Sequence, residues 1–356
     1  MTEVVAILPG TVADPATPSG GNIYDRHLCQ ELAAAGRPVR EIAVDGDWPR
    51  PGPAARARLA DILAGLPDGT VVLADGLVVC GVPEVVAPHA GRLRLAVLVH
   101  LPLADETGLA PADASALDAA ERATLAVADA VLATSDWTAR RLVDGHGLAA
   151  GRVHVARPGV APGPLAAGSP GGGRLACVAS VTPRKGHDVL VDALATVADL
   201  DWECTCAGAL TAAGHVERVR SRIAHYGLTE RVRLVGPRAG AALAATFGAA
   251  DLLVLPSHAE TYGMVVTEAL ARGVPVLTTE VGGAPEALGR AGDGSLPGML
   301  VPPGDPAALG GALRRWLTDA GLRERLRAAA GRRRAGLAGW DATAATVAGV
   351  LDGLRR

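Results

Sequence analysis

Two glutamates and two adjacent cations have the types and spacing for chemistry on one ligand. Glu260 and Glu268 lie eight positions apart in the segment 252–272, and Arg184 and Lys185 lie upstream of them. Carboxylates accept hydrogen bonds from sugar hydroxyls, whereas a compact ammonium beside a forked guanidinium suits a diphosphate. These residues therefore predict a site for a ligand that carries both a sugar and phosphates. A solvated basic turn and solvated carboxylates are the alternatives.

The segment around Glu260 is predicted to be a strand, a loop and a helix. The apolar run Leu252 to Leu255 indicates a buried strand, which Pro256 ends, and a helical pattern begins at Met264. Glu260 is therefore expected at the C-terminal mouth of a strand, where open α/β sheets bind ligands. The free N–H groups near Gly263 and Met264 would suit an anion such as a phosphate.

The N-terminal segment repeats this order of elements. A strand over 4–8 is followed by a polar loop over 11–21 that closes on Gly20 and Gly21, and by a helix over 22–35. Backbone N–H groups of such a loop could face an anion or a sugar. The GxGxxG spacing of a dinucleotide site is absent, so a flexible loop with a glycine turn is an equal alternative.

A single histidine, His100, follows the apolar strand 93–99 directly. A lone histidine is more often structural, but the C-terminal end of a strand favours a functional role. Asp45 and Asp47 resemble the metal-binding Asp-x-Asp of some glycosyltransferases. Because they lie in a turn rich in proline and glycine, we expect solvated carboxylates and no metal there.

Composition excludes several classes of protein. The chain has 356 residues, 49% hydrophobic and 20% charged, which is typical of a globular protein with two domains. A net charge of −3 gives no nucleic-acid footprint. The start resembles a first strand rather than a signal peptide, and no apolar run is long enough to span a bilayer, so we expect a cytoplasmic protein. The five scattered cysteines are predicted to be core residues rather than a metal site or disulfides. The basic run 323–334 indicates a solvated helix face, with at most a weak membrane-surface contact as the alternative.

Strands alternate with helices in both halves of the sequence. The segment 157–173 between the halves is rich in proline and glycine, as expected of a linker. This alternation predicts an α/β protein of two parallel, doubly wound domains facing across a cleft. We expect one domain over 1–160 and another over 170–337.

The sequence LPSHAETYGMVVTEALARGVPV, with Pro-Arg-Lys-Gly-His-Asp upstream and Gly-Gly-Ala-Pro-Glu downstream, resembles the retaining glycosyltransferases of family 4, which have the GT-B fold. The similarity covers essentially the whole chain and is most specific over 180–303. It implies two Rossmann-like domains, of which the C-terminal one binds the nucleotide-sugar donor and the N-terminal one lies on the acceptor side. It also implies that a last helix, at about 338–356, packs back onto the first domain.

The resemblance implies a role for each matching residue. Glu260 would bind donor-sugar hydroxyls near the anomeric centre, and Glu268 the ribose. Lys185 would neutralise the leaving diphosphate, and His100 would face the donor sugar. The remaining implied donor-binding groups are the loop glycines Gly20 and Gly21 and backbone N–H groups around Tyr262, Gly263 and Met264. The arginine that the family places near Ser180 is missing, and Arg184 is the candidate to replace it.

We therefore predict a bacterial retaining glycosyltransferase that moves a sugar from a UDP-hexose or GDP-sugar to a hydroxyl-bearing small molecule or glycan, without a metal or other cofactor. The acceptor surface is expected around 20–25 and 100–109. Asp105 and Glu106 suggest a polar acceptor, or serve only for solubility. A GT-B epimerase or phosphorylase, and a non-catalytic protein that binds nucleotide sugars, are the other readings.

Overall fold

The structure is a computed structural model that describes residues 3–14 and 19–354. Contacts divide it into two units. Unit 1 comprises the chain up to Asp14, Ser19–Gly159 and the C-terminal segment from Ala338, and unit 2 is Val160–Leu337. Part of the predicted polar loop, 15–18, lies outside the described residues.

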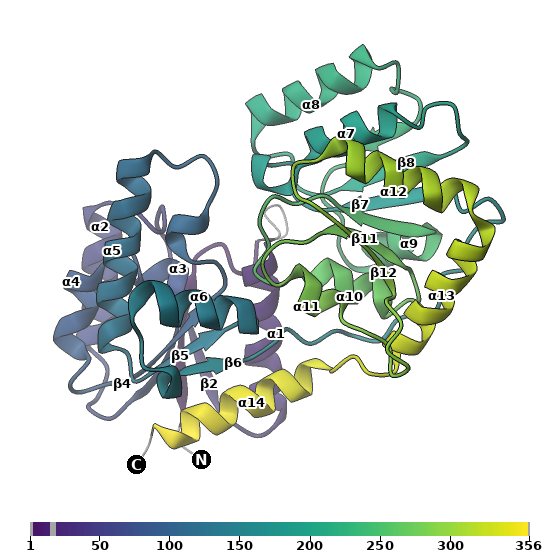
Figure 1. The fold of residues 1–356 in the computed structure, drawn as a ribbon. Helices are drawn as coiled ribbons and strands as arrows, with labels where there is room; N and C mark the ends of the chain where they lie inside the picture. The colour runs from purple at the N-terminus through teal and green to yellow at the C-terminus, as the bar shows by residue number, and fades with distance from the viewer. Residues whose placement is uncertain (1–2, 15–18, 355–356) are drawn as a thin grey trace. The chain divides into compact units, whose positions relative to one another are not determined.

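Unit 1 is built on a six-stranded parallel sheet in the order β2-β1-β3-β4-β5-β6 (Figure 1). Its strands are β1 (Val4–Pro9), β2 (Val39–Val44), β3 (Val71–Asp75), β4 (Arg94–Val99), β5 (Ala130–Ala133) and β6 (Val153–Val155). Its helices are α1 (Gly20–Ala34), α2 (Pro53–Ala64), α3 (Gly76–Val79), α4 (Pro83–Val86), α5 (Pro111–Val127), α6 (Asp136–His146) and α14 (Trp340–Gly353), with 3-10 turns η1 (Ala87–His89), η2 (Leu103–Asp105) and η3 (Ala150–Arg152).

Unit 2 is built on a second six-stranded parallel sheet, in the order β12-β11-β10-β7-β8-β9. Its strands are β7 (Arg174–Val178), β8 (Glu203–Ala207), β9 (Val232–Leu234), β10 (Leu252–Leu255), β11 (Val276–Thr279) and β12 (Gly298–Val301). Its helices are α7 (His187–Ala195), α8 (Ala213–His225), α9 (Gly240–Ala249), α10 (Met264–Leu270), α11 (Ala284–Leu288), α12 (Pro306–Thr318) and α13 (Ala320–Arg334), with the 3-10 turn η4 (Pro183–Lys185).

The central strands of both sheets are almost wholly buried, as their apolar runs predict. Every residue of β1, β3 and β10 is buried, because helices cover parallel sheets on both faces. The strand order reverses between β1 and β3 in unit 1 and between β7 and β10 in unit 2. Doubly wound sheets bind ligands at the carboxyl ends of the strands at such points. The predicted class, two Rossmann-like doubly wound domains, is confirmed.

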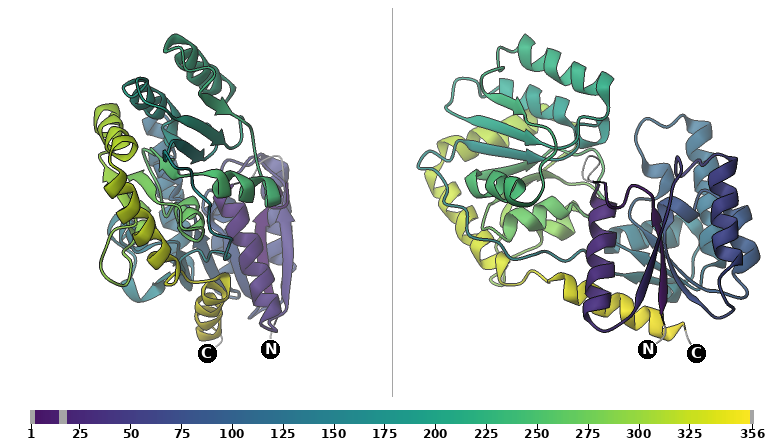
Figure 2. Two further views of the ribbon diagram at one scale, coloured as in Figure 1. Left: turned by 90° about the vertical axis from the view of Figure 1, so that its right-hand side faces the viewer. Right: turned by 180° about the vertical axis from the view of Figure 1, so that it is seen from behind.

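The last helix, α14, packs on α1 within unit 1, where Figure 2 shows the yellow helix meeting the purple one. The Trp340 ring meets the Tyr24 ring edge-on at 5.3 Å between centroids and stacks on His27 at 4.7 Å. The Thr343 hydroxyl donates to the carbonyl oxygen of Arg157. Arg37, which is buried, pairs with Asp352 at 2.7 Å. These contacts fasten the C-terminal segment to the first helix of the chain.

The structure corrects the N-terminal loop. Gly20 and Gly21 lie in the first turn of α1 rather than in a loop, because the Ser19 side chain caps the helix by accepting from the Asn22 N–H. The short helices α3 and α4 were not expected, and other boundaries differ by a few residues. Among the residues that the structure describes, no helix combines the length and apolar character needed to cross a bilayer.

Candidate functional site

In unit 2, Glu260 lies in the loop after β10 and its side chain is 5% exposed. Its Oε1 atom accepts from the Lys185 ammonium at 2.5 Å and from the Ser257 hydroxyl at 2.7 Å. Both hydrogen bonds end on the same oxygen. Oε2 therefore has no hydrogen-bond partner among the described residues, and it remains for a ligand. Lys185 and Glu260 are brought together as predicted, although here they pair with each other.

Glycines allow the two loops to approach this closely. Gly186 has a φ of +65°, and a Cβ atom there would lie 2.2 Å from the Pro256 carbonyl oxygen. A Cβ atom at Gly282 would lie 1.8 Å from the Glu260 carbonyl oxygen, which accepts from the N–H of Gly283. Side chains at these positions would push the turns apart. The glycines next to the cations and after β11 therefore fix the backbone around Glu260.

The negative charge of Glu260 is balanced by the cations beside it. Burial raises the pKa of Glu260, but the ammonium of Lys185 and, further off, the guanidinium of Arg184 outweigh burial, so that the pKa lies below its usual value. The carboxylate is thus ionised at neutral pH. We call Lys185, Ser257 and Glu260 the unit 2 cluster.

Glu268 lies in the second turn of α10 and is half-buried. Burial raises the pKa of its carboxyl, and the nearby Arg272 lowers it less. Arg272 donates to the backbone oxygen of Glu268, not to its carboxylate. The half-buried carboxylate is therefore placed to take hydroxyl donors from a ligand.

The residues before α10 take different positions. Tyr262 is 7% exposed and packs in the apolar core of unit 2. Gly263 caps the helix with a φ of +89°, and the helix begins at Met264. The Tyr262 side chain is therefore part of the core, and the predicted ligand contact of its backbone N–H stays a prediction.

Unit 1 carries a second cluster of ionisable groups around His100, which follows β4. The imidazole Nε2 lies 2.8 Å from Asp25 Oδ1, and the side chains are 17% and 1% exposed. Asp75, at the end of β3, caps α3 by accepting from the Leu77 N–H, and a carboxyl oxygen of Asp75 lies within 4.8 Å of ligand atoms of Asp25 and His100. We call Asp25, Asp75 and His100 the unit 1 cluster.

Helix α1 presents a small residue, an aromatic ring and a carboxylate to His100. A Cβ atom at Gly21 would lie 3.1 Å from the His100 ring, so a larger residue would crowd the imidazole. Tyr24 meets the ring edge-on at 5.1 Å and anchors itself by donating to the Ala156 carbonyl. With Asp25, these residues are spaced three and four apart and share one helix face. The role of Gly21 in the structure is therefore to seat His100.

The pKa shifts in the unit 1 cluster differ in direction from that of Glu260 in the unit 2 cluster. Burial lowers the pKa of His100, but the Asp25 carboxylate outweighs it and raises the pKa to about 9. Burial and the Asp25 charge raise the pKa of Asp75 to about 8. At neutral pH these raised pKa values favour a charged His100 and a neutral Asp75 carboxyl.

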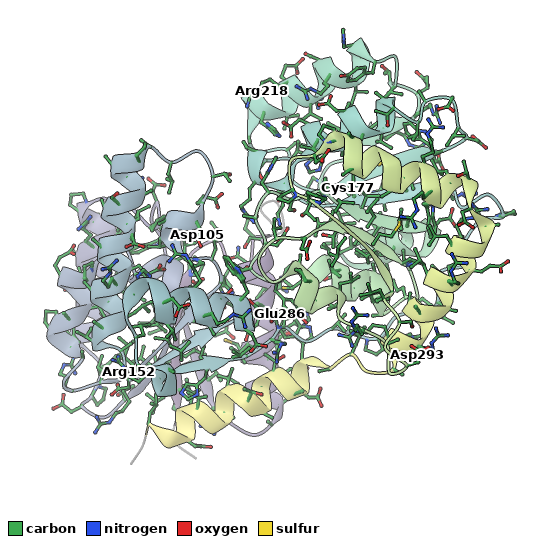
Figure 3. All side chains as sticks on the ribbon, viewed as in Figure 1. Asp105, Arg152, Cys177, Arg218, Glu286 and Asp293 are labelled. Atoms are coloured by element: carbon green, nitrogen blue, oxygen red, sulfur yellow. The ribbon has the colours of Figure 1, made fainter. Side chains whose placement is uncertain are left out.

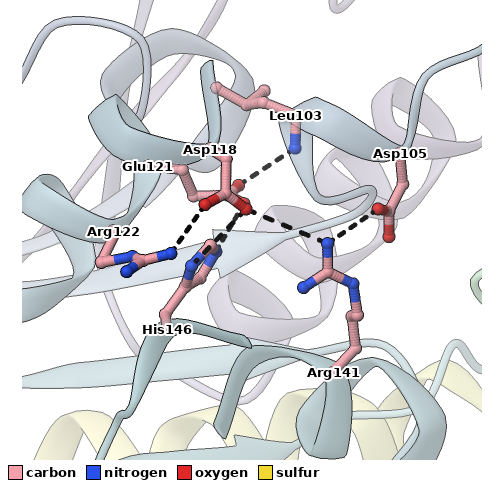
Figure 4. Close-up of polar contacts among 7 residues, drawn as sticks. All are labelled: Leu103, Asp105, Asp118, Glu121, Arg122, Arg141 and His146. Carbon is pink, nitrogen blue, oxygen red and sulfur yellow. Dashed lines mark hydrogen bonds and ion pairs between the residues drawn. The ribbon is translucent and has the colours of Figure 1, made fainter. Parts of the chain in front are cut away.

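The loop after His100 is fastened to α5 and α6 by a polar network (Figure 4). The buried carboxylate of Glu121 accepts from the Leu103 N–H and pairs with His146 at 3.0 Å. Asp105, marked in Figure 3, pairs with Arg141 at 3.0 Å. The Asp105 carboxylate, predicted to suggest a polar acceptor, is thus engaged in holding the loop.

Comparison with known sequences finds similarity to glycosyltransferases. Residues 170–333 match the family described as glycosyl transferases group 1. A D-inositol 3-phosphate glycosyltransferase of Kineococcus radiotolerans is 33% identical over 251 residues, which cover 63% of this chain and 57% of the relative. Another, from Catenulispora acidiphila, is 34% identical over 280 residues, covering 73% of this chain and 64% of the relative. These matches support a glycosyltransferase of the family 4 type.

Solved glycosyltransferases share the fold of the whole chain. A sucrose-phosphate synthase from Thermosynechococcus elongatus has a TM-score of 0.80 at 23% identity and covers 99% of both chains. The Anabaena protein HepE, solved with UDP and glucose, has a TM-score of 0.74 at 17% identity, covering 99% of this chain and 100% of HepE. The chain therefore has the GT-B fold of two Rossmann-like domains. It spans little more than half the length of the first curated relatives, 57% of each.

Arg184 lies where it could replace the family arginine missing near Ser180. Its Nη1 donates to the Ala259 carbonyl, and its own carbonyl accepts from the His258 N–H at 2.8 Å. The guanidinium thus lies against the loop that carries Glu260. Its replacement of the missing arginine in this glycosyltransferase stays a prediction.

The basic run of α13 forms specific contacts within unit 2. Arg327 pairs with the buried Asp251 at 2.8 Å, and Arg323 donates to the Trp316 carbonyl. Arg334 donates to the Gly163 carbonyl. These arginines hold α13 to its own unit, which favours the structural reading of the run.

The predicted core role of the cysteines is confirmed, because all five are buried and free. Cys177, marked in Figure 3, lies 3.6 Å from the Nε2 atom of His187, and the sulfurs of Cys204 and Cys206 are 3.9 Å apart. Asp45 and Asp47 are exposed, as expected of solvated loop carboxylates.

Sequence reasoning missed three residues of the two clusters: Ser257, Asp25 and Asp75. Ser257 lies three residues before Glu260, a spacing that could have indicated it. It also missed a compositional signal, because Lys185 is the single lysine of the chain, in which all other Lys or Arg positions are arginine. A compact ammonium at this one position indicates a requirement that a guanidinium does not meet.

Proposed function

We propose that this chain is a retaining glycosyltransferase of the family 4 type that moves a hexose from a nucleoside-diphosphate donor to a hydroxyl of an acceptor. The observation that carries the proposal is the unit 2 cluster at the carboxyl ends of β7 and β10. One oxygen of a buried carboxylate is held there by the single lysine and a serine, and its second oxygen is left for a ligand. This arrangement favours transfer over a purely structural ion pair.

Each group of the cluster has a distinct task in the proposed reaction. Glu260 Oε2 would accept from donor-sugar hydroxyls near the anomeric carbon. The ammonium of Lys185, with the guanidinium of Arg184, would stabilise the negative charge that develops on the leaving diphosphate. Glu268 would take the ribose hydroxyls, and the N–H groups of Gly263 and Met264 a sugar or phosphate oxygen.

Retention of configuration needs no protein nucleophile in this scheme. As the bond between the anomeric carbon and the phosphate oxygen breaks, that oxygen takes the proton of the acceptor hydroxyl. The acceptor oxygen then bonds to the anomeric carbon on the same face. No metal is assigned to any step, and both clusters consist of side chains that stabilise charge or bind hydroxyls.

The ligands and names of the similar proteins suggest which donor and acceptor to test first. HepE was solved with UDP-glucose and with UDP, so UDP-glucose is the first donor, ahead of GDP-sugars. The curated relatives are named for D-inositol 3-phosphate, so a phosphorylated cyclitol is the first acceptor. A cytoplasmic location, where nucleotide sugars are made, is part of the same proposal.

The test is a thermal-shift panel of UDP-, GDP-, ADP- and TDP-hexoses, followed by a transfer assay with the donor that binds. A ligand that binds only the folded state raises the unfolding temperature by mass action. Transfer should be lost in Glu260→Gln and retained in Glu217→Gln, which removes an exposed carboxylate from α8. Binding with no transfer to any acceptor would instead favour a non-catalytic protein. Sugar isomer or sugar phosphate formed without an acceptor would favour an epimerase or a phosphorylase.

A further inference from the structure

Unit 2 contains another buried group of side chains, which the proposed transfer reaction does not use. Cys177 lies in β7, Cys206 in β8 and His187 at the start of α7. All three are buried, and one ligand atom from each lies within 4.8 Å of the other two. Thiolates and imidazoles are the ligands that soft and borderline metal ions prefer. We call Cys177, His187 and Cys206 the sulfur cluster.

The fold assembles the sulfur cluster from three elements. Cys177 and Cys206 are register partners in the parallel pair of β7 and β8, so their side chains lie on the same face of the sheet. Cys204, two residues before Cys206, faces the same way. His187, from the helix that packs in the same core, brings its Nε2 atom to 3.6 Å from the Cys177 sulfur. Because no local Cys-x-x-Cys pattern contains these positions, the sequence predicted core cysteines and no metal site.

The distances match those between two ligands of one tetrahedral zinc ion. With bonds of about 2.3 Å to sulfur and about 2.1 Å to nitrogen, such an ion holds a sulfur and a nitrogen about 3.6 Å apart, and two sulfurs about 3.8 Å apart. The Cys177 sulfur and the His187 nitrogen are 3.6 Å apart, and the sulfurs of Cys204 and Cys206 are 3.9 Å apart. A hydrogen bond between a thiol and an imidazole is the alternative explanation of the first distance.

The burial of His187 favours a metal over that alternative. The residue is 1% exposed, and its Nδ1 atom has no hydrogen-bond partner among the described residues. A thiol is only a weak donor and a weak acceptor, so the contact with Cys177 offsets little of the cost of burying the imidazole. A bond from Nε2 to a metal ion would offset that cost.

We propose that Cys177, His187 and Cys206 bind a Zn²⁺ ion in the core of unit 2, with Cys204 as the fourth ligand. Three cysteines and one histidine are a common ligand set of structural zinc sites. Each thiol loses its proton when it binds the ion. Zn²⁺ is expected rather than Cu⁺, because a divalent ion leaves less thiolate charge uncompensated in a buried place.

The ion would have a structural role. Four protein ligands leave no coordination position for a substrate, so the expectation that the transfer step uses no metal is unaffected. His187 directly follows Gly186, which ends the turn η4 that carries Arg184 and Lys185. A metal bound to His187 would therefore restrain the end of this turn, and the cysteines would remain core residues. The proposal does not depend on the proposed function.

The experiment measures zinc in the whole protein by mass spectrometry, after expression with added Zn²⁺ and dialysis against metal-free buffer. We expect about one zinc ion per chain. Cys206→Ser and His187→Gln should each lose most of it, because loss of a ligand should weaken binding at least about 100-fold. Cys80→Ser, which alters a buried free cysteine of unit 1, is the matched control and should keep the ion. A folded wild type without zinc, or undiminished zinc in both ligand variants, would overturn the proposal.

Further arms keep the test decisive if the ligand variants do not fold. The wild type refolded with Co²⁺ should show the visible absorption bands of tetrahedral cobalt and a charge-transfer band from thiolate to metal. Absence of both would count against the site, and copper in place of zinc would contradict the assignment of the ion. Removal of zinc with a chelator should lower the unfolding temperature, because the ion binds the folded state. Bound zinc in a protein that shows no transfer would sustain the proposal while the proposed function failed.

Discussion

In the unit 2 cluster one buried carboxylate pairs with one ammonium, whereas the unit 1 cluster contains two carboxyl groups and one imidazole. In the first, charges balance without an added proton, and the pKa of Glu260 falls below its usual value. In the second, a proton must be added for balance, and the pKa of Asp75 rises to about 8. Burial is similar in both, so the number of cations, not burial, decides the direction of the shift.

The two clusters should therefore respond differently to the same kind of substitution. Removal of a charge from the unit 2 cluster should affect the transfer reaction, because Lys185 and Glu260 are proposed to contact the donor. Removal of the Asp25 carboxylate should first affect the protonation state of His100. Removal of the proton from Asp75 should affect the stability of unit 1.

The largest effect is expected from Lys185. Lys185→Ala should lower kcat/KM at least about 100-fold, because it removes the fixed cation proposed to stabilise the leaving diphosphate. The unfolding temperature should also fall, because the variant leaves the buried Glu260 carboxylate without its ammonium partner. Lys185→Arg keeps the charge in a chain that uses arginine at every other such position, and should recover only part of the activity. Wild-type rates in Lys185→Ala would remove Lys185 from the mechanism.

The next largest effect is on stability, at Asp25. Asp25→Ala leaves the His100 ring unpaired in a buried place, and breaking such a pair costs about 3–5 kcal/mol. Chemical denaturation at pH 7 should show this loss. Glu3→Ala, which breaks an exposed pair with Arg40, is the control and should cost about 1 kcal/mol or less. Equal losses in the two variants would show that the cluster is not a buried ion pair.

Asp75 should give unit 1 a pH-dependent stability. The native state keeps a proton on Asp75 up to a pKa of about 8, whereas the unfolded chain loses it near 4. The stabilisation is therefore complete below pH 4 and is lost as the pH rises to 8, at up to about 1.4 kcal/mol per pH unit. Asp75→Asn should remove this dependence. Parallel denaturation curves for the wild type and Asp75→Asn across pH 5–8 would contradict it.

The smallest effect is expected from lowering the pH around the Glu260 carboxylate. Because the pKa of Glu260 is lowered, its pairing with Lys185 stabilises the folded state at any pH above the usual carboxyl pKa. This stabilisation is lost only as the pH falls below that value. Donor binding should therefore stay constant from pH 7 to pH 5. A loss of donor binding within this range that is absent in Glu260→Gln would show that the carboxylate is not held ionised by Lys185.

The contrast between the clusters also explains what the sequence could and could not predict. The unit 2 residues lie in two short segments, each a strand followed by a loop, so local patterns placed Lys185 and Glu260 together. The same reasoning predicted the alternating strands and helices, since apolar runs and glycine turns carry that signal locally.

The unit 1 cluster could be only partly predicted. His100 stood out by its place after a strand, but Asp25 lies in an ordinary helical pattern and Asp75 ends an apolar strand. Their meeting depends on the strand order β1-β3-β4, which no local pattern encodes. Gly20 and Gly21 were expected in a loop, because the capping role of Ser19 was not recognised.

The central claim is that the unit 2 cluster binds a nucleotide sugar, with Lys185 on the diphosphate and Glu260 on the sugar. Calorimetric titration of UDP and UDP-glucose into the wild type, Glu260→Gln and Lys185→Ala tests it most directly. The account predicts that Glu260→Gln binds UDP as the wild type does but loses the added affinity for UDP-glucose, while Lys185→Ala loses affinity for both. UDP-glucose affinity that is unchanged in both variants would contradict it.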